Sequence, residues 1–251
     1  HFTSRDIIYL MCDLLTTGEV LTPEEQRDGI HRTVYDMAMG TSQMLTCMEE
    51  RLKMLDSNAD ISTFGQEINP FTFGIAKADM LIHGGDPDNM QFGDTLSDDK
   101  FKGYQFDYCI SNPPFGIDWK REAPIVEAEY KKGDAGRFGP GLPSKSDGQM
   151  LFLLNGVKKL KDTGRMAIIQ NGSSLFTGDA GSGPSKIRQY LIENDWLDAI
   201  IQLPNDSFYN TGIATYIWIV TKEKPAEHVG RVQLKLFTCN IITTFNDIFC
   251  D

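Results

Sequence analysis

Hydrophobic positions recur along the chain with two different periods, and the two periods alternate. Apolar residues three and four positions apart predict helices, and short apolar runs predict buried strands. The expected helices cover residues 4–15, 44–55, 70–82, 149–160 and 186–193. The expected strands cover residues 34–39, 64–68, 106–110, 166–170 and 197–203, with further β-like runs at 213–220 and 232–237. This alternation predicts an α/β domain with a mainly parallel, doubly wound sheet covered on both faces.

Three segments have local features of their own. Thr3-Ser4-Arg5-Asp6 has the spacing of a capping box, and Asn69 before Pro70 is the favoured order at a helix start. Residues 118–147 are rich in Gly and Pro, and their six Lys and Arg balance six acidic residues. Because irregular segments longer than about 12 to 15 residues are usually functional or disordered, we expect an irregular functional segment here.

Charge and composition exclude several classes of protein. The net charge of -11 argues against strong unaided binding to a polyanion, which needs clustered Lys and Arg. No apolar run is long enough to span a membrane, and no secretory signal is present. Five widely spaced cysteines and four scattered histidines support neither a disulfide framework nor a metal site, so we expect a reducing cytoplasm. The chain begins inside a patterned segment, and we expect further sequence upstream of it.

Polar residues stand at or just past the ends of several predicted strands. In such sheets ligands bind beyond the carboxyl ends of the strands, so Asp36, Glu67 and Asn112 could line one crevice. Gly40 would let the backbone approach a ligand, and the helix after it would offer free N–H groups. Glu67 could clasp ribose hydroxyls or could be a solvated strand end. Asp94 could accept from an adenine amino group or could make an Asx turn.

The segment Ser111-Asn112-Pro113-Pro114-Phe115-Gly116 follows a predicted buried strand. Each proline lacks an N–H and holds the residue before it extended, so the segment is a stiff loop. A simple strand-terminating turn would also explain the prolines. Alternatively, the Asn112 side chain and the Pro113 carbonyl could accept the two hydrogens of an exocyclic amino group, leaving its lone pair free to attack. The Phe115 ring would then stack on a base swung out of its duplex.

The combination of motifs has a clear family likeness. Asn112-Pro113-Pro114-Phe115 resembles motif IV of amino-methyltransferases, and residues 34–41 resemble their S-adenosylmethionine motif I. The chain as a whole resembles the methylase (modification) subunit of type I restriction-modification systems, which methylates adenine at N6 in DNA. The likeness is carried by residues 2–5, 65–84, 106–116, 146–154 and 203–220. It implies a class I S-adenosylmethionine-dependent methyltransferase fold with an antiparallel edge.

The resemblance also implies domains, partners and site residues. The catalytic domain would cover residues 1–238 without the family's N-terminal helical domain, followed by a C-terminal extension over residues 239–251. The partners would be DNA, a specificity subunit, a restriction subunit and a second methylase subunit, and residues 118–147 would contact DNA or a partner. The implied catalytic residues are Asn112, Pro113, Pro114 and Phe115. The implied S-adenosylmethionine-binding residues are Phe2, Thr3, Ser4, Arg5, Asp36, Ala38, Gly40, Thr41, Ser42, Glu67, Asp94 and Asn112.

Motif I departs from the family pattern Asp-Pro-Ala-Cys-Gly-Thr-Gly-Gly. Met37, Met39, Ser42 and Gln43 stand at its second, fourth, seventh and eighth places, and the last two add side chains where the backbone should approach the cofactor. Three functions therefore stay open. The chain could methylate adenine in DNA, could methylate another amino group such as a protein glutamine or an RNA base, or could be a non-catalytic assembly module.

Overall fold

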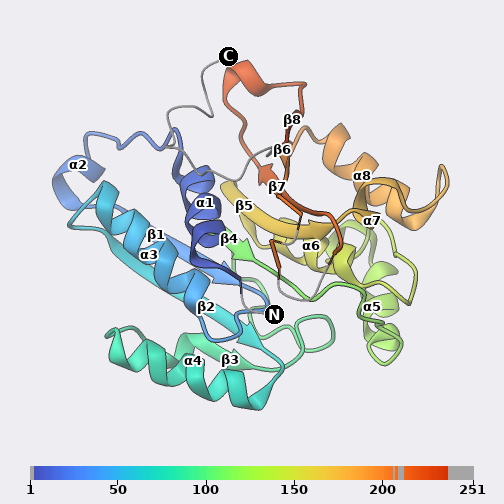
Figure 1. The fold of residues 1–251 in the computed structure, drawn as a ribbon, viewed down its shortest axis with the longest axis horizontal. Helices are drawn as coiled ribbons and strands as arrows, with labels where there is room; N and C mark the ends of the chain where they lie inside the picture. The colour runs from blue at the N-terminus through green and yellow to red at the C-terminus, as the bar shows by residue number, and fades with distance from the viewer. Residues whose placement is uncertain (1–2, 206, 209–211, 237–251) are drawn as a thin grey trace.

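The computed structural model describes residues 3–205, 207–208 and 212–236, and the predictions for Phe2 and for residues 239–251 lie outside this part. Within it, eight strands form a single sheet in the order β3-β2-β1-β4-β5-β7-β6-β8 (Figure 1). The strands are β1 (His31–Asp36), β2 (Asp60–Glu67), β3 (Met90–Phe92), β4 (Phe106–Ser111), β5 (Leu160–Asn171), β6 (Leu197–Gln202), β7 (Thr215–Thr221) and β8 (Gln233–Leu236).

The sheet is parallel apart from β7, which pairs antiparallel with both β5 and β6. The strand β7 therefore runs opposite to its neighbours, near the edge of the sheet that β8 forms. The strands β3, β2, β1, β4 and β5 run parallel to one another. This confirms the predicted α/β class and its mainly parallel sheet. It also places the carboxyl ends of β1, β2 and β4 along the same edge of the sheet.

Helices cover both faces of the sheet (Figure 1). They are α1 (Arg5–Thr16), α2 (Glu25–Asp28), α3 (Gln43–Leu55), α4 (Pro70–Ile82), α5 (Ala123–Tyr130), α6 (Gln149–Lys158), α7 (Ser173–Phe176) and α8 (Gly183–Glu193). Short 3-10 turns are η1 (Pro87–Asn89), η2 (Gly133–Ala135) and η3 (Ala226–His228). No helix in the part of the chain just listed has the length and apolar character needed to cross a membrane.

Two apolar cores lie on opposite faces of the sheet because neighbouring strand residues point in opposite directions. Val34 packs with residues of α1, α3 and α4, whereas Tyr35 packs with residues of α5, α6 and α8. Both side chains are completely buried. The Tyr35 ring stacks on Phe106 with 4.7 Å between centroids, a contact worth about 0.5–1.5 kcal/mol beyond its burial. The cores fix the strands, and with them the edge that carries the polar residues.

Several element predictions need correction. The strand predicted over residues 34–39 ends at Asp36, because the Asp36 carboxylate accepts the Ala38 N–H at 3.0 Å and turns the chain. The three-residue strand β3 was not predicted. The capping box at the first helix does not form: Ser4 is the N-cap, and its side chain makes no capping hydrogen bond. By contrast, Asn69 caps α4 as predicted, accepting from the N–H groups of the second and third helical residues.

The segment over residues 118–147 is mostly irregular, as expected, but it is more ordered than the sequence indicated. It contains α5 and a 3-10 turn, and it is packed against the domain through buried Trp119, Val126 and Arg137. The Trp119 indole N–H donates to the Ser144 carbonyl at 2.9 Å, which joins the two halves of the segment. The helix is short and is followed by a Gly-rich stretch, so its apolar residues give little periodic signal.

Candidate active site

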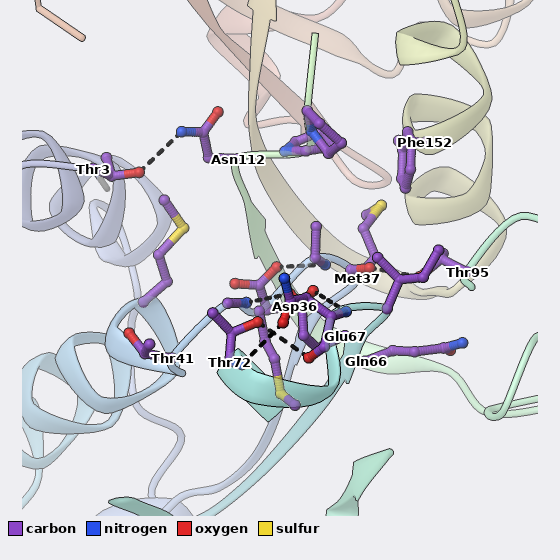
Figure 2. Close-up of a pocket in the computed structure, with 18 of the residues that line it drawn as sticks. Thr3, Asp36, Met37, Thr41, Gln66, Glu67, Thr72, Thr95, Asn112 and Phe152 are labelled. Carbon is purple, nitrogen blue, oxygen red and sulfur yellow. Dashed lines mark hydrogen bonds between the residues drawn. The ribbon is translucent and has the colours of Figure 1, made fainter. Parts of the chain in front are cut away.

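A cavity of about 420 Å³ opens at the carboxyl ends of β1, β2 and β4 (Figure 2). It brings together most of the residues that the sequence proposed for one crevice. Those lining it are Thr3, Asp36, Ala38, Gly40, Thr41, Glu67, Asp94, Asn112, Pro113, Pro114 and Phe115. In the view of Figure 2, Thr3 and Asn112 lie on one side, with Asp36 and Glu67 across from them.

Three of the proposed residues do not line this cavity. Ser4 and Arg5 are exposed at the start of α1, where their side chains face solvent. Ser42 is completely buried behind the loop that follows β1. Of the proposed N-terminal group within the described residues, only Thr3 reaches the cavity.

Asp36 is a buried carboxyl group at the floor of the cavity, with 1% of its surface exposed. Its Oδ1 accepts from the Ala38 N–H at 3.0 Å and from the Ser111 hydroxyl at 2.6 Å. Burial raises its pKa to about 7, against the lowering effect of these two donors. Through Ser111, Asp36 also ties the end of β1 to the residue directly before Asn112.

Glu67 ends β2 and organises the loop after β1. Its Oε2 accepts the Gly40 N–H at 2.8 Å, and its Oε1 accepts the Asn69 N–H at 2.7 Å. Gly40 has φ of +54°, a left-handed conformation that a side chain would disfavour. A carboxylate has about four acceptor sites, so Glu67 is held in place and still has room for two ligand hydroxyls.

Ser42 stands at the N-cap of α3 with φ of +68°, which explains why the family favours glycine at this place. Its hydroxyl donates to the Thr41 carbonyl at 2.6 Å and lies 3.2 Å from Oδ2 of Asp79 on α4. The side chain therefore turns toward α4, away from the cavity. The expected crowding of the cofactor loop does not arise at Ser42, whereas Gln43 does line the cavity.

Asp94 both lines the cavity and makes the Asx turn that the sequence left as an alternative. Its Oδ1 accepts from Leu96 N at 3.2 Å, and its Oδ2 accepts from Ser97 N at 3.1 Å. The turn is held from behind by Arg137, whose guanidinium donates to the carbonyls of Thr95 and Leu96 at 2.6 and 3.0 Å. Sequence analysis missed this residue, because its 42-residue separation from Thr95 leaves no local pattern.

Arg137 is itself fixed by a partly buried ion pair. Its Nε donates to Oε2 of Glu129 at 2.8 Å, and its Nη1 donates to the Asn155 side chain at 3.1 Å. Arg137 is 8% exposed and lies over the Phe138 ring, 4.7 Å from the ring centroid. The segment at residues 118–147 thus supports the loop that presents Asp94.

Asn112 follows β4 and faces the cavity beside two prolines. Its Nδ2 donates to the Thr3 hydroxyl at 2.9 Å, which leaves its Oδ1 as a free acceptor in this arrangement. The Phe115 ring packs edge-on against Phe208, with 6.3 Å between centroids and 83° between planes. The loop thus carries acceptor oxygens and a supported aromatic ring.

The remaining wall is largely apolar and was not foreseen. Met37 and Met39 were interpreted as strand residues, yet they lie in the turn after β1 and line the cavity with Met44. Met39 packs directly over Gly65, because a Cβ at Gly65 would lie 2.2 Å from the Met39 sulfur. The glycine at position 65 was therefore the sequence feature that could have indicated this close packing. The other unpredicted lining residues are Ile8, Gln66, Ile68, Asn69, Thr72, Gly93, Thr95, Ile117 and Phe152.

These features suit a ligand that has hydroxyl and amino groups on one part and an apolar body on another. Carboxylates of Glu67 and Asp94 accept hydrogen bonds, and methionine and aromatic side chains pack against flat or aliphatic groups. Among the described residues, no group of three His, Cys, Asp or Glu side chains is placed to hold a metal ion.

Sequence comparison shows that the chain is similar to DNA methylases. The sequence model for N-6 DNA methylases matches residues 1–239. Among curated proteins, the chain is 27% identical over 202 residues to the type I restriction enzyme MjaIX methylase subunit of Methanocaldococcus jannaschii, covering 80% of this chain and 35% of the relative. It is 29% identical over 232 residues to the MpnII methylase subunit of Mycoplasma pneumoniae, covering 82% and 40%. The chain therefore spans less than half the length of these relatives.

Solved structures agree with the sequence comparison. The type I restriction-modification methyltransferase subunit of Streptococcus thermophilus superposes with a TM-score of 0.73 at 29% identity, covering 89% of this chain and 45% of that one. A Listeria monocytogenes protein assigned to the class I S-adenosylmethionine-dependent methyltransferases has a TM-score of 0.64 at 18% identity, covering 92% and 63%. The fold is that of class I methyltransferases, as predicted.

Proposed function

Because the chain belongs to the N-6 DNA methylase family, we propose that it transfers a methyl group from S-adenosylmethionine to N6 of adenine in DNA. We propose that it does so as the catalytic part of the modification subunit of a type I restriction-modification complex. Residues 1–238 would form the catalytic domain, and residues 239–251 would form its C-terminal extension.

One observation carries the proposal: Asn112 and Pro113 line the same cavity as Asp36, Glu67 and Asp94. A loop suited to an exocyclic amino group therefore faces residues suited to a nucleoside. A methyl transfer needs both partners in one place, because the donor and the acceptor must meet within van der Waals distance.

The residues present fit the cofactor. Glu67 would accept from the ribose hydroxyls and Asp94 from the adenine amino group, as acceptors at these strand ends do in related folds. Gly40 lets the backbone approach closely, since no atom lies within 4 Å of where its Cβ would be. Ala38 and Thr41 would border the methionine end. When bound, S-adenosylmethionine supplies the activated methyl group.

The chain's own residues would prepare the adenine. The Asn112 Oδ1 and the Pro113 carbonyl would each accept one N6 hydrogen, which favours the pyramidal amine with its lone pair exposed. The Phe115 ring would stack on the base, which must leave the duplex to enter the cavity. Two consecutive prolines keep the acceptors in place, so little reorganisation is needed during the reaction.

The acidic charge of the chain indicates that partners supply much of the contact with DNA. Because the chain has a net charge of -11, its attraction to the DNA phosphate backbone is weak. We therefore assign recognition of the DNA sequence and most of the DNA binding to a specificity subunit. A restriction subunit and a second methylase subunit would complete the complex. The free, buried thiols of Cys12, Cys47 and Cys109 suit a reducing cytoplasm, where the DNA substrate also lies.

The test is methyl transfer by the full-length protein assembled with its specificity subunit, using radiolabelled S-adenosylmethionine and DNA that contains the recognised site. We expect Asn112→Ala to lower the rate about 100-fold or more, the scale seen when a charge-stabilising hydrogen-bond partner is removed from an active site. Asn58→Ala, an exposed residue far from β4, is the matched control and should be unaffected. Equal rates in Asn112→Ala and wild type would overturn the proposal.

Two other functions are distinguished by the same preparation. Methylation of RNA or of a protein glutamine, with no incorporation into DNA, would favour a different amino substrate. No heat of binding on titration with S-adenosylmethionine would favour a non-catalytic assembly module.

A further inference from the structure

The hydrogen bond between Thr3 and Asn112 joins two segments that are 109 residues apart in sequence (Figure 2). Thr3 lies just before α1, and Asn112 lies just after β4. The distance from Nδ2 to Oγ1 is 2.9 Å, a normal length for such a bond. Both residues line the cavity, so the contact is part of its wall.

The chemistry of a carboxamide makes this contact consequential. An asparagine side chain has a donating NH₂ on one side and an accepting oxygen on the other. With the NH₂ turned to Thr3, the oxygen points away from Thr3 in Figure 2 and is available to a ligand amino group. After a 180° rotation the Thr3 hydroxyl could donate to the oxygen, but the Asn112 NH₂ would then face the ligand NH₂ without an acceptor. The ligand amino group therefore selects the orientation, and Thr3 holds the carboxamide in place.

Both ends of the contact are anchored to rigid elements. The helix that follows Thr3 is held by buried Ile8, Met11 and Leu15, and its last turn is capped by Arg165 of β5. The Arg165 guanidinium donates to the Leu14, Leu15 and Thr17 carbonyls at 2.7 to 3.0 Å.

Asn112 is anchored from the other side. Ser111, directly before it, is completely buried and donates to Asp36 at 2.6 Å. Pro113, directly after it, is buried and fixes the backbone. Rotation about the side-chain bonds is therefore the main freedom left to Asn112, and Thr3 is the group that restricts it.

We propose that Thr3 is a positioning residue that holds the carboxamide of Asn112 against the cavity wall, where its oxygen can accept from the substrate amino group. The inference rests on the proposed function and adds a role to it. It differs from the role that the family resemblance implies for Thr3, which is contact with the methionine end of the cofactor. A residue that acts on Asn112 should affect the transfer step, whereas a residue that holds the cofactor should affect cofactor affinity.

The kinetic test compares Thr3→Val, which removes the hydroxyl at nearly constant shape, with Thr3→Ser, which keeps it. In the full-length complex, we expect Thr3→Val to lower the single-turnover rate at saturating S-adenosylmethionine by about 2- to 12-fold, the equivalent of one net hydrogen bond. Thr3→Ser should restore it, and the cofactor Kd should stay within about twofold of wild type. Thr17→Val, at the other end of α1, is the matched control and should leave both quantities unchanged.

A double-mutant cycle ties the effect to Asn112. In an Asn112→Ala background, Thr3→Val should cause no further loss, because the group it holds is gone. An equal loss in both backgrounds would overturn the proposal. So would weaker cofactor binding in Thr3→Val with an unchanged rate at saturation.

A second measurement does not depend on activity. The side-chain NH₂ signals of Asn112 in ¹⁵N–¹H spectra of this chain are identified by their absence in Asn112→Ala. They should shift in Thr3→Val and keep their positions in Thr3→Ser, and unmoved signals in Thr3→Val would overturn the proposal. If they shift while the wild-type complex methylates no DNA, the proposed function fails and the positioning contact stands.

Discussion

The buried carboxyl group of Asp36 gives the fold a pH dependence that the substitution Asp36→Asn should remove. Burial raises the pKa of Asp36 from its ordinary value of 3.8 to about 7 in the folded chain. A raised pKa means that the folded state prefers the protonated acid. The stability contributed by Asp36 is thus fully present below pH 3.8 and is lost as the pH rises through 7.

The size of the effect follows from these two pKa values. Asp36 ionises more easily in the unfolded chain than in the folded one. At 1.36 kcal/mol per pKa unit, this difference destabilises the folded state by about 4 kcal/mol at pH 8 and by about 1.6 kcal/mol at pH 5. Asparagine carries no charge, and its Oδ1 can accept both bonds that Oδ1 of Asp36 accepts, from Ala38 and Ser111. Asp36→Asn should therefore be more stable than wild type, by an amount that grows by about 2.5 kcal/mol between pH 5 and pH 8.

Urea unfolding without cofactor at pH 5, 6, 7 and 8 measures this difference. Asp179→Asn removes an exposed carboxylate and serves as the control for the loss of one carboxylate. The reasoning is refuted if the gap between Asp36→Asn and wild type is the same at all four pH values, or if it narrows as the pH rises.

Three further substitutions, at Ser42 and Arg137, test the supports of the cofactor loops. Ser42→Ala keeps the left-handed φ of +68° and loses the hydroxyl bonds, so its unfolding free energy should fall by about 1 kcal/mol, whereas Ser42→Gly relieves the strain and should stay near wild type in urea unfolding. A glycine variant less stable than the alanine variant would contradict this. Arg137→Met removes the donor to the Thr95 carbonyl and leaves Glu129 with only the backbone N–H of residue 137, so stability should fall by about 1–3 kcal/mol and S-adenosylmethionine should bind more weakly in calorimetry. Unchanged affinity in a folded Arg137→Met variant would show that Asp94 needs no such support.

Much of the site could be placed from sequence because of how parallel strands are arranged. Asp36 and Glu67 end strands of the parallel part of the sheet and Asn112 directly follows one, and those strand ends share one edge. Locating the strands therefore located the residues, even though the strand that contains Asp36 was predicted to begin and end three residues too late. The role of Asn69 could be predicted equally well, because its side chain caps the helix that directly follows it in the sequence.

The parts that sequence could not provide depend on long-range packing. The side chain of Ser42 was expected to face the cofactor, and only its backbone conformation shows that it turns toward Asp79. Arg137 lies in a segment that looked irregular, and its partners are Glu129 and a loop some 40 residues earlier. No local sequence pattern indicates the contact of Thr3 with Asn112. Thr3 is explained by its place before a helix and Asn112 by its place after a strand, so neither residue points to the other.

The bond between Ser42 and Asp79 has a consequence for how the family's sequences can diverge. The buried Ser42 hydroxyl has one proton, for which the Thr41 carbonyl at 2.6 Å and Oδ2 of Asp79 at 3.2 Å are both acceptors. In a relative with glycine at the position of Ser42, Asp79 loses this contact but keeps its contacts with Thr46 and His83. The acidic side chain should therefore be retained more often where serine stands than where glycine does. The cofactor loop can in this way exchange a glycine that its motif favours for a serine whose side chain turns toward the next helix.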